Sequence, residues 1–205
     1  MGNESKKHTI VCFCENSIEI SVPEKINLEE NPDVEGNIIE GTFLTYTCSF
    51  CGKELKPELP VHIADYSRNI DLYFIPEHER AAYLTGKKQF PPHKRVVIGY
   101  PELVEKIKLY RWDLDDRIIE IIKFYLLEKA GGSPEIKVYL EAFEEDQLVF
   151  HLHGVKEDEI GIVPIPLSFY KKTEDQFAEI ESDEQFSELL HPPYISIHKI
   201  YIGDS

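Results

Sequence analysis

The alternation of hydrophobic and polar residues predicts that the first part of the chain consists largely of short strands. Between residues 17 and 22, Ile18, Ile20 and Val22 alternate with polar residues, which is the period of a half-buried strand. Other short segments are rich in β-branched and aromatic residues and are interrupted by glycine, proline or asparagine, as strands are. Strands are therefore expected at residues 8–13, 17–22, 42–48, 54–59, 61–66, 69–75 and 94–99.

A different period, typical of an amphipathic helix, marks residues 114–130. Asp113 can cap the first turn of this helix, and Gly131 and Gly132 can end it. Its apolar face consists of Leu114, Ile118, Ile121, Ile122, Tyr125 and Leu126. Shorter helices, each with a proline at or near its start, are expected at residues 31–41, 76–86 and 101–110.

The best linker candidate is Ala130-Gly131-Gly132-Ser133-Pro134, because glycine and proline interrupt regular structure there. The chain after it again predicts mixed structure. The elements expected there are strands at 135–143, 147–153 and 159–165, two helical pieces within 167–190, and a closing strand at 194–202. The pattern therefore predicts an α+β protein with two domains, residues 1–130 and residues 135–205.

The charge is strongly negative and unevenly distributed. The net charge of the 205-residue chain is −16, and the last 75 residues hold 16 acidic and 5 basic residues. An acidic surface repels polyanions, which argues against a nucleic-acid partner. No apolar stretch is long enough to cross a membrane, and the N-terminus lacks the apolar segment of an export signal. We therefore expect a cytoplasmic protein with no membrane partner.

The four cysteines all lie within the first 51 residues, which favours a metal site over disulfides in a chain without an export signal. The stronger half of the pattern is Cys48-Ser49-Phe50-Cys51-Gly52. Two thiolates on one zinc ion lie roughly under 4 Å apart, which a CxxC turn achieves. The following glycine allows the backbone to turn away.

The weaker half is Cys12-Phe13-Cys14, which is one residue shorter than the usual pair. In a straight strand these side chains would lie too far apart to chelate one ion, so the backbone must bend there or one sulfur must reach by its rotamer. The gap of 33 residues between Cys14 and Cys48 exceeds the common spacing of about 15–20 residues. The extra length costs only about 0.5 kcal/mol of loop-closure entropy. We predict that Cys12, Cys14, Cys48 and Cys51 bind one structural zinc ion, with disulfides or free thiols as alternatives.

Several segments together resemble the CpXC domain family, a bacterial and archaeal group of uncharacterised function. They are the cysteine pair after an Ile-Val strand, Asn31-Pro32-Asp33 with Gly41, Tyr46–Gly52, Gly99–Ile107 and Leu114–Glu120. The resemblance covers about residues 8–129. The first pair of the family reads Cys-Pro-x-Cys, whereas this chain has Cys12-Phe13-Cys14. The resemblance implies a cysteine-built metal site beside an α+β domain, and it implies no enzymatic activity.

Two further patterns allow a functional and a structural interpretation. His151-Leu152-His153 lies on a predicted strand, whose period of two places both imidazoles on one face. They could bind a divalent metal, or that face could simply be the more solvated one. The basic loop at 87–95 could hold single-stranded nucleic acid by charge and stacking, or be a solvated loop. Its residues are Lys87, Lys88, His93, Lys94 and Arg95, with Phe90 among them.

Two acidic segments also allow both a functional and a structural interpretation. Asp115-Asp116-Arg117 could be a pair of acid–base carboxylates, or a helix cap with a salt bridge. The region 171–190 could be a pair of amphipathic helices on the C-terminal sheet, or an acidic surface that binds a partner. Its spaced apolar residues are Phe177, Ile180, Phe186, Leu189 and Leu190.

The sequence contains no phosphate-binding loop, dinucleotide fingerprint, nucleophile elbow or metalloprotease motif. A closed four-thiolate site also leaves no coordination position for a substrate. We therefore expect a zinc-ribbon-like hairpin unit joined to a mixed sheet with helices, followed by a smaller α+β unit. The expected function is that of a non-enzymatic, zinc-stabilised module that binds another protein. Zinc-ribbon nucleic-acid binding through the basic loop is the alternative, and an enzyme with a cleft between the domains is the third class. The oligomeric state does not follow from the sequence.

Overall fold

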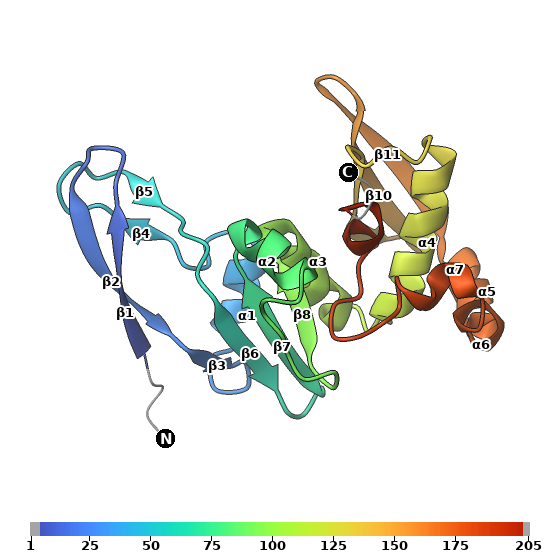
Figure 1. Cartoon of the computed structure of the whole chain (residues 1–205), viewed down its shortest axis with the longest axis horizontal. Helices are drawn as coiled ribbons and strands as arrows, with labels where there is room; N and C mark the ends of the chain where they lie inside the picture. The colour runs from blue at the N-terminus through green and yellow to red at the C-terminus, as the bar shows by residue number, and fades with distance from the viewer. Residues whose placement is uncertain (1–4, 203–205) are drawn as a thin grey trace. The chain divides into compact units, whose positions relative to one another are not determined.

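The computed structural model describes residues 5–202 and the side chains of residues 5–199, in two compact units that divide after Ile107. The first unit contains two hairpins and one larger sheet (Figure 1). Its strands are β1 (Ser5–Val11), β2 (Ser17–Pro23), β3 (Lys25–Asn27), β4 (Tyr46–Thr47), β5 (Glu54–Leu55), β6 (Val61–Asp65), β7 (Ile70–Ile75) and β8 (Arg95–Ile98). Its helices are α1 (Asp33–Ile39), η1 (Glu77–Glu79), α2 (Arg80–Leu84) and the first part of α3 (Gly99–Arg111).

The larger sheet of the first unit is mixed, as the sequence predicted. Its order is β3-β6-β7-β8, with β3 parallel to β6, β6 antiparallel to β7, and β7 parallel to β8. Ile63 and Phe74 are fully buried at its centre. The ring of Tyr100 at the start of α3 packs 5.2 Å from the ring of Phe74, and Leu103 and Ile107 of α3 are buried. The apolar face of α3 therefore covers this sheet.

The second unit is an antiparallel three-stranded sheet with helices. Its elements are α4 (Asp116–Lys129), β9 (Lys137–Glu144), β10 (Gln147–Lys156), β11 (Glu159–Pro166), α5 (Leu167–Asp175), α6 (Phe177–Glu181), α7 (Glu184–Ser187) and η2 (Ile197–Ile202). The strand order is β11-β10-β9. Ile118 and Ile122 of α4 share one core with Leu140 and Phe150 of the sheet and with Phe186. The predicted α+β class is confirmed in both units.

Several details differ from the sequence-based expectations. The strands expected at 42–48 and 54–59 are limited to Tyr46–Thr47 and Glu54–Leu55. Asp113 is not the cap of the long helix, because Asp115 is, and its side chain accepts a hydrogen bond from the Arg117 amide at 2.8 Å. The region 167–190 forms three helices rather than two pieces. The closing strand expected at 194–202 is wrong, because Ile197–Ile202 is a 3-10 helix. The His198 amide donates to the Ser196 hydroxyl and the Ile197 amide donates to Glu120 of α4, so neither amide is available for strand pairing.

The division of the chain also falls earlier than the linker at 130–134. Helix α4, which the sequence placed in the first domain, packs its apolar face against the sheet of the second unit. Gly131 and Gly132 both have positive φ and end α4, which is the geometry of a helix C-terminus. Within residues 5–202, no helix combines the length and apolarity needed to cross a membrane.

Candidate metal centre

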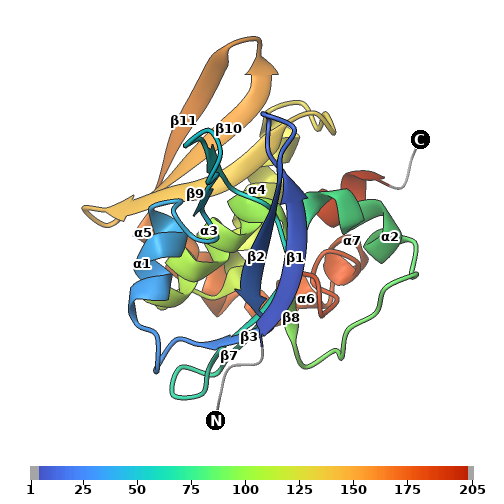
Figure 2. The same ribbon diagram turned by 90° about the vertical axis from the view of Figure 1, so that its left-hand side faces the viewer.

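The first two cysteines lie in the turn that joins β1 to β2, a hairpin that Figures 1 and 2 show beside the β4–β5 hairpin. Strand β1 ends at Val11, so Cys12 and Cys14 are not in a straight strand. The Cys12 amide donates to the Asn16 carbonyl at 2.9 Å, and the Glu15 amide donates to the Cys12 carbonyl at 2.8 Å. Glu15 adopts the left-handed conformation with φ of 67°. The required bend of the short pair is thus present.

The other two cysteines lie in the turn between β4 and β5, which repeats the same geometry. The Cys48 amide donates to the Lys53 carbonyl at 2.8 Å, and the Gly52 amide donates to the Cys48 carbonyl at 2.9 Å. Gly52, directly after Cys51, has φ of 73°. In both turns a left-handed residue follows the second cysteine, which reverses the chain so that both sulfurs lie on its inner side.

The four sulfur atoms cluster around one common centre. The distance between the Sγ atoms is 3.5 Å for Cys12 and Cys51 and 3.8 Å for Cys14 and Cys48. All four Sγ atoms lie within 4.8 Å of one another. Tetrahedral coordination with metal–sulfur bonds of about 2.3 Å places sulfurs about 3.8 Å apart. A disulfide requires about 2.05 Å, so these sulfurs are spaced for a shared ion and not for covalent pairing.

The environment of the sulfurs favours thiolates at two of the positions. Amides of Phe50 and Cys51 hydrogen-bond the sulfur of Cys48 and lower its pKa. The side-chain amide of Asn16 donates to the sulfur of Cys14 at 3.4 Å, and with the Asn16 backbone it lowers the pKa of Cys14 to about 6. At Cys12 the Cys14 amide acts in the same sense, but burial and the neighbouring thiols raise the pKa to about 12. A cation at the centre would therefore find part of its ligand set already anionic.

One side of the cluster is closed by apolar side chains. Cys12, Cys48 and Leu55 are buried together, and Ile10 and Ile18 pack against them. Cys14 is half-buried and Cys51 is exposed, so the cluster lies at the surface rather than in the main core. Four sulfur donors in a tetrahedral arrangement suit a soft, tetrahedral metal and not magnesium or calcium, which take oxygen ligands. The residues present therefore fit a metal ion.

The structure does not bring the other sequence candidates into a comparable cluster. The rings of His151 and His153 on β10 have centroids 6.3 Å apart. Among the described residues, only the four cysteines form a group of three or more potential ligands close enough for one ion. In the basic loop, Lys88 is paired with Glu79 and Lys94 with an aspartate of β7. The apolar residues of 171–190 mostly enter the core, as the helical interpretation predicted.

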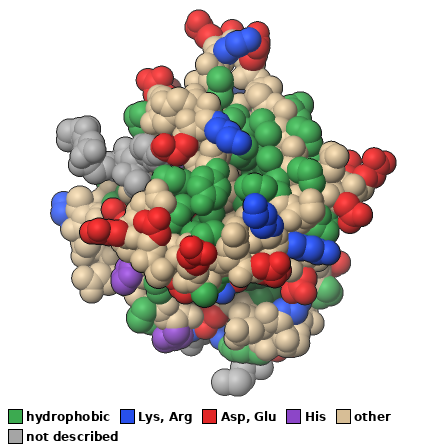
Figure 3. Space-filling model, turned by 90° about the vertical axis from the view of Figure 1, so that its right-hand side faces the viewer, with side chains coloured by type: hydrophobic (Ala, Val, Ile, Leu, Met, Phe, Trp, Pro, Cys, Tyr) green, Lys and Arg blue, Asp and Glu red, His purple; other side chains and the backbone are tan. Residues whose placement is uncertain are grey.

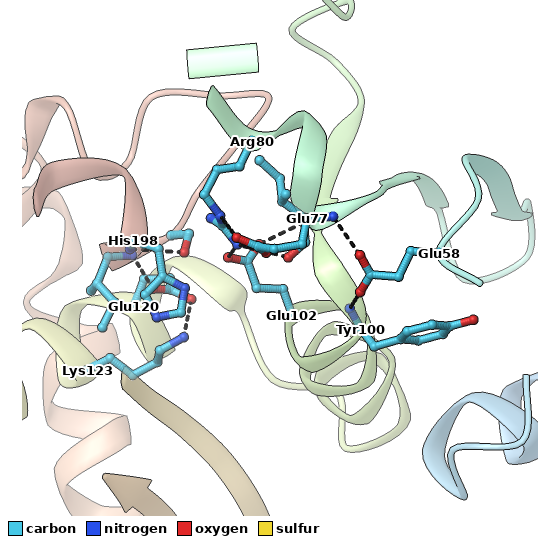
Figure 4. A network of polar contacts seen from close by, with 11 residues as sticks. Glu58, Glu77, Arg80, Tyr100, Glu102, Glu120, Lys123 and His198 are labelled. Carbon is cyan, nitrogen blue, oxygen red and sulfur yellow. Dashed lines mark hydrogen bonds and ion pairs between the residues drawn. The ribbon is translucent and has the colours of Figure 1, made fainter. Parts of the chain in front are cut away.

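Two networks of buried or half-buried charges were not expected from the sequence (Figure 4). In the first unit, Glu58 accepts hydrogen bonds from the amides of Glu77 at 2.6 Å and Tyr100 at 3.0 Å. In the second unit, Lys123 is fully buried and bonds Glu120 at 2.7 Å. Glu120 also accepts from the Ile197 amide at 2.7 Å. These carboxylates bond the amides at the starts of helices, so their role is structural.

The sequence interpretation also missed the exposure of two aromatic residues beside the sulfurs. Phe13 lies between Cys12 and Cys14 and is 82% exposed, and Phe50 lies between Cys48 and Cys51 and is 64% exposed. Val11 is exposed as well. Both phenylalanines lie in turns whose sulfurs are within 4.8 Å of one another, and their position inside both cysteine motifs is the signal that could have revealed them.

Comparison with known proteins identifies a family for this chain but does not identify an activity. A family model described as CpXC protein matches residues 10–123, more than half of the chain. A Treponema pallidum (strain Nichols) protein, described as an uncharacterized protein, is 27% identical over 212 residues, which covers 93% of this chain and 96% of that protein. No solved structure matches. All four cysteines lie within the matched region.

Proposed function

The chain belongs to the CpXC protein family, and from this premise we propose that it is a zinc-stabilised, non-enzymatic module that binds another protein. One observation carries the proposal: four sulfurs from two separate turns lie within 4.8 Å of one another. Because a four-thiolate site leaves no open coordination position, the metal serves to fix structure rather than to activate a substrate. The family match covers the whole site and is consistent with this role.

Zinc is the metal that this donor set favours. Tetrahedral sites of four sulfurs hold zinc or iron, and zinc combines this geometry with freedom from redox chemistry. Native mass spectrometry of the purified full-length chain should show one zinc ion per chain, with a colourless protein. A coloured, iron-containing protein, or a clearly substoichiometric metal content with four reactive thiols, would contradict the assignment of zinc. The same spectrum reports the number of subunits.

The binding surface that the metal would organise is formed by Phe13, Phe50 and Val11. Aromatic side chains anchor many protein interfaces because each buries a large apolar area at a small entropic cost. Each phenylalanine is flanked by two ligand cysteines, so metal binding would hold both rings in fixed positions before the partner arrives. A partner protein with an apolar pocket fits this surface.

A capture experiment from the native cells tests the partner. The bait is the full-length chain in three forms: the natural sequence, a double variant with Phe13→Ser and Phe50→Ser, and a control with Tyr66→Ser. Tyr66 is 64% exposed, as Phe50 is, but lies in the β6–β7 turn. A protein that binds the natural chain and the control but not the double variant, with zinc retained in all three, supports the proposal. Equal capture by all three forms would remove Phe13 and Phe50 from the interface, and catalytic turnover without a partner would overturn the function.

Nucleic-acid binding through the basic loop is the second candidate, and one observation favours it. Phe90 belongs to a row of rings in which His62 and Tyr73 lie 4.4 Å apart, Tyr73 and Phe90 4.9 Å, and Phe90 and Tyr83 6.0 Å. Two lysines of the loop are already paired with carboxylates, which weakens their attraction for phosphate. Binding of single-stranded oligonucleotides that falls steeply with salt and is lost when the loop is neutralised would establish this function instead.

A further inference from the structure

The second unit contains a cavity of about 520 Å³ that the proposed function does not use. It lies among α4, the end of β11 and the beginning of α5. Six of its nine lining side chains are apolar or aromatic, namely Ile122, Tyr125, Leu126, Ile165, Pro166 and Phe169. Figure 3 shows hydrophobic side chains gathered over one face, with both basic and acidic side chains around them.

The charges at this cavity are opposite to those of the unit around it. Residues 108–205 contain 21 Asp and Glu but only 10 Lys and Arg. No acidic residue lines the cavity, whereas two of the ten basic residues, Lys129 and Lys172, do. In the described part of the chain neither lysine has an ion pair or hydrogen-bond partner for its ammonium group. The two exposed ammonium groups beside the apolar cavity could therefore pair with a negatively charged group of a ligand.

We propose that this cavity binds a small amphipathic anion, with one carboxylate and an apolar hydrocarbon body, of the class of fatty acids. The apolar walls would receive the hydrocarbon body, since removal of apolar surface from water drives such binding. The long aliphatic stems of Lys129 and Lys172 can lie along that body while their ammonium groups reach the carboxylate. Ser168 adds a hydroxyl to the same lining.

The size of the cavity favours a small molecule over a segment of a partner protein. Cavities of about 300–1,000 Å³ hold single small ligands, and 520 Å³ lies in the middle of that range. An amphipathic helix of a partner would instead need a groove with anchors over about two turns, roughly 10 Å. The proposal is independent of the metal centre, whose cysteines all lie in the first unit.

Isothermal titration calorimetry of the full-length, zinc-loaded protein tests the proposal with decanoate and its uncharged analogue 1-decanol. Decanoate should saturate at one molecule per chain and bind about tenfold more tightly than decanol or better, because only the carboxylate meets the two lysines. The double variant with Lys129→Gln and Lys172→Gln should bind both compounds alike. Lys171→Gln is the matched control, because Lys171 lies on the same helix but does not line the cavity, and it should leave decanoate binding unchanged.

A second variant tests whether the ligand lies inside the cavity or only near the two lysines. Ser168 is exposed at the lining, so Ser168→Trp adds a bulky side chain there without disturbing the core, and it should abolish binding of both compounds. The proposal is overturned if decanoate does not bind, if it binds without saturation at one site, or if the double lysine variant keeps the preference for decanoate. Binding of anionic phosphatidylglycerol vesicles without binding of decanoate would show a membrane surface instead, and would equally overturn it.

Discussion

Removal of the metal should unfold the two cysteine turns while the rest of the first unit stays folded. The reason is the small amount of apolar surface that holds the turns together. Leu55 is the one buried aliphatic residue of that cluster, with Ile10 and Ile18 partly buried beside it. Full burial of such side chains contributes about 1.5–3 kcal/mol each, so together they supply at most about 5–9 kcal/mol. Structural zinc contributes about 10–16 kcal/mol in small finger peptides.

The larger share of the stability in this region therefore depends on the ion. Without it, β1–β2 and β4–β5 are two-stranded hairpins, and isolated hairpins are marginally stable in water. The four-stranded sheet is different, because Ile63, Leu72 and Phe74 are fully buried in a core of its own. Its stability does not require the sulfurs.

Hydrogen exchange measured by mass spectrometry separates these two regions. On chelation, or in the variant Cys48→Ser, peptides covering 10–18 and 46–55 should exchange at nearly the rate of unfolded chain. Peptides covering 61–75 should keep their protection. Ser49→Ala is the control, since Ser49 lies in the same turn but is not a ligand. Unchanged protection of the turns in metal-free protein would refute the reasoning, and so would simultaneous loss of protection in β6 and β7.

Three further predictions concern the rest of the fold. Lys123→Met should destabilise the protein by about 3–5 kcal/mol in chemical denaturation, because it leaves Glu120 charged and buried, whereas the double variant with Glu120→Gln should recover much of that loss. Although burial opposes it, hydrogen bonds from Ser67 and Arg68 lower the pKa of Asp65 from 3.8 to about 2. This pKa is depressed in the folded state, so Asp65 stabilises the fold by about 2 kcal/mol above pH 4, and this contribution should be lost as the pH falls toward 2 and be absent from Asp65→Asn. Gly99→Ala should cost about 1–2 kcal/mol, measured as a lower denaturation midpoint, because φ at Gly99 is 78° and its new Cβ would lie 2.7 Å from a Glu77 oxygen.

Periodicity predicted the existence of most elements but not the surfaces against which they pack. The apolar stripe of residues 114–130 correctly gave α4, now observed over Asp116–Lys129. The stripe carries no information about which sheet receives it, so the helix was placed in the first domain although it packs in the second unit. The two glycines after it looked like a linker for the same reason. A helix end and a domain boundary have the same local sequence signals, and only long-range contacts distinguish them.

The candidate site was predictable to the extent that cysteine chemistry is local. Spacing and compartment predicted that four thiols would meet, and the four Sγ atoms do so. The bend that allows Cys12 and Cys14 to converge depends on a left-handed Glu15, which sequence statistics disfavour for a residue other than glycine or asparagine. The hydrogen bond from Asn16 to the Cys14 sulfur could not be predicted either, because an asparagine in a turn usually bonds its own backbone. The cavity of the second unit depends on three elements that come together only in the fold.

The unequal stability of the first unit has a consequence for its proposed function. If the turns are ordered by the ion and the sheet is not, metal binding controls the presentation of Phe13 and Phe50 without controlling whether the protein is folded. A partner that needs both rings in fixed positions would then bind only the metal-loaded form, because the metal-free form must first order two turns at a cost of about 1–2 kcal/mol for each residue fixed. Chelation should therefore abolish capture of the partner at metal concentrations where the protection of β6 and β7 against hydrogen exchange is unchanged. Capture that persists in fully metal-free protein would mean that the partner does not require the turns to be ordered by the ion, and would refute this link between metal and partner binding.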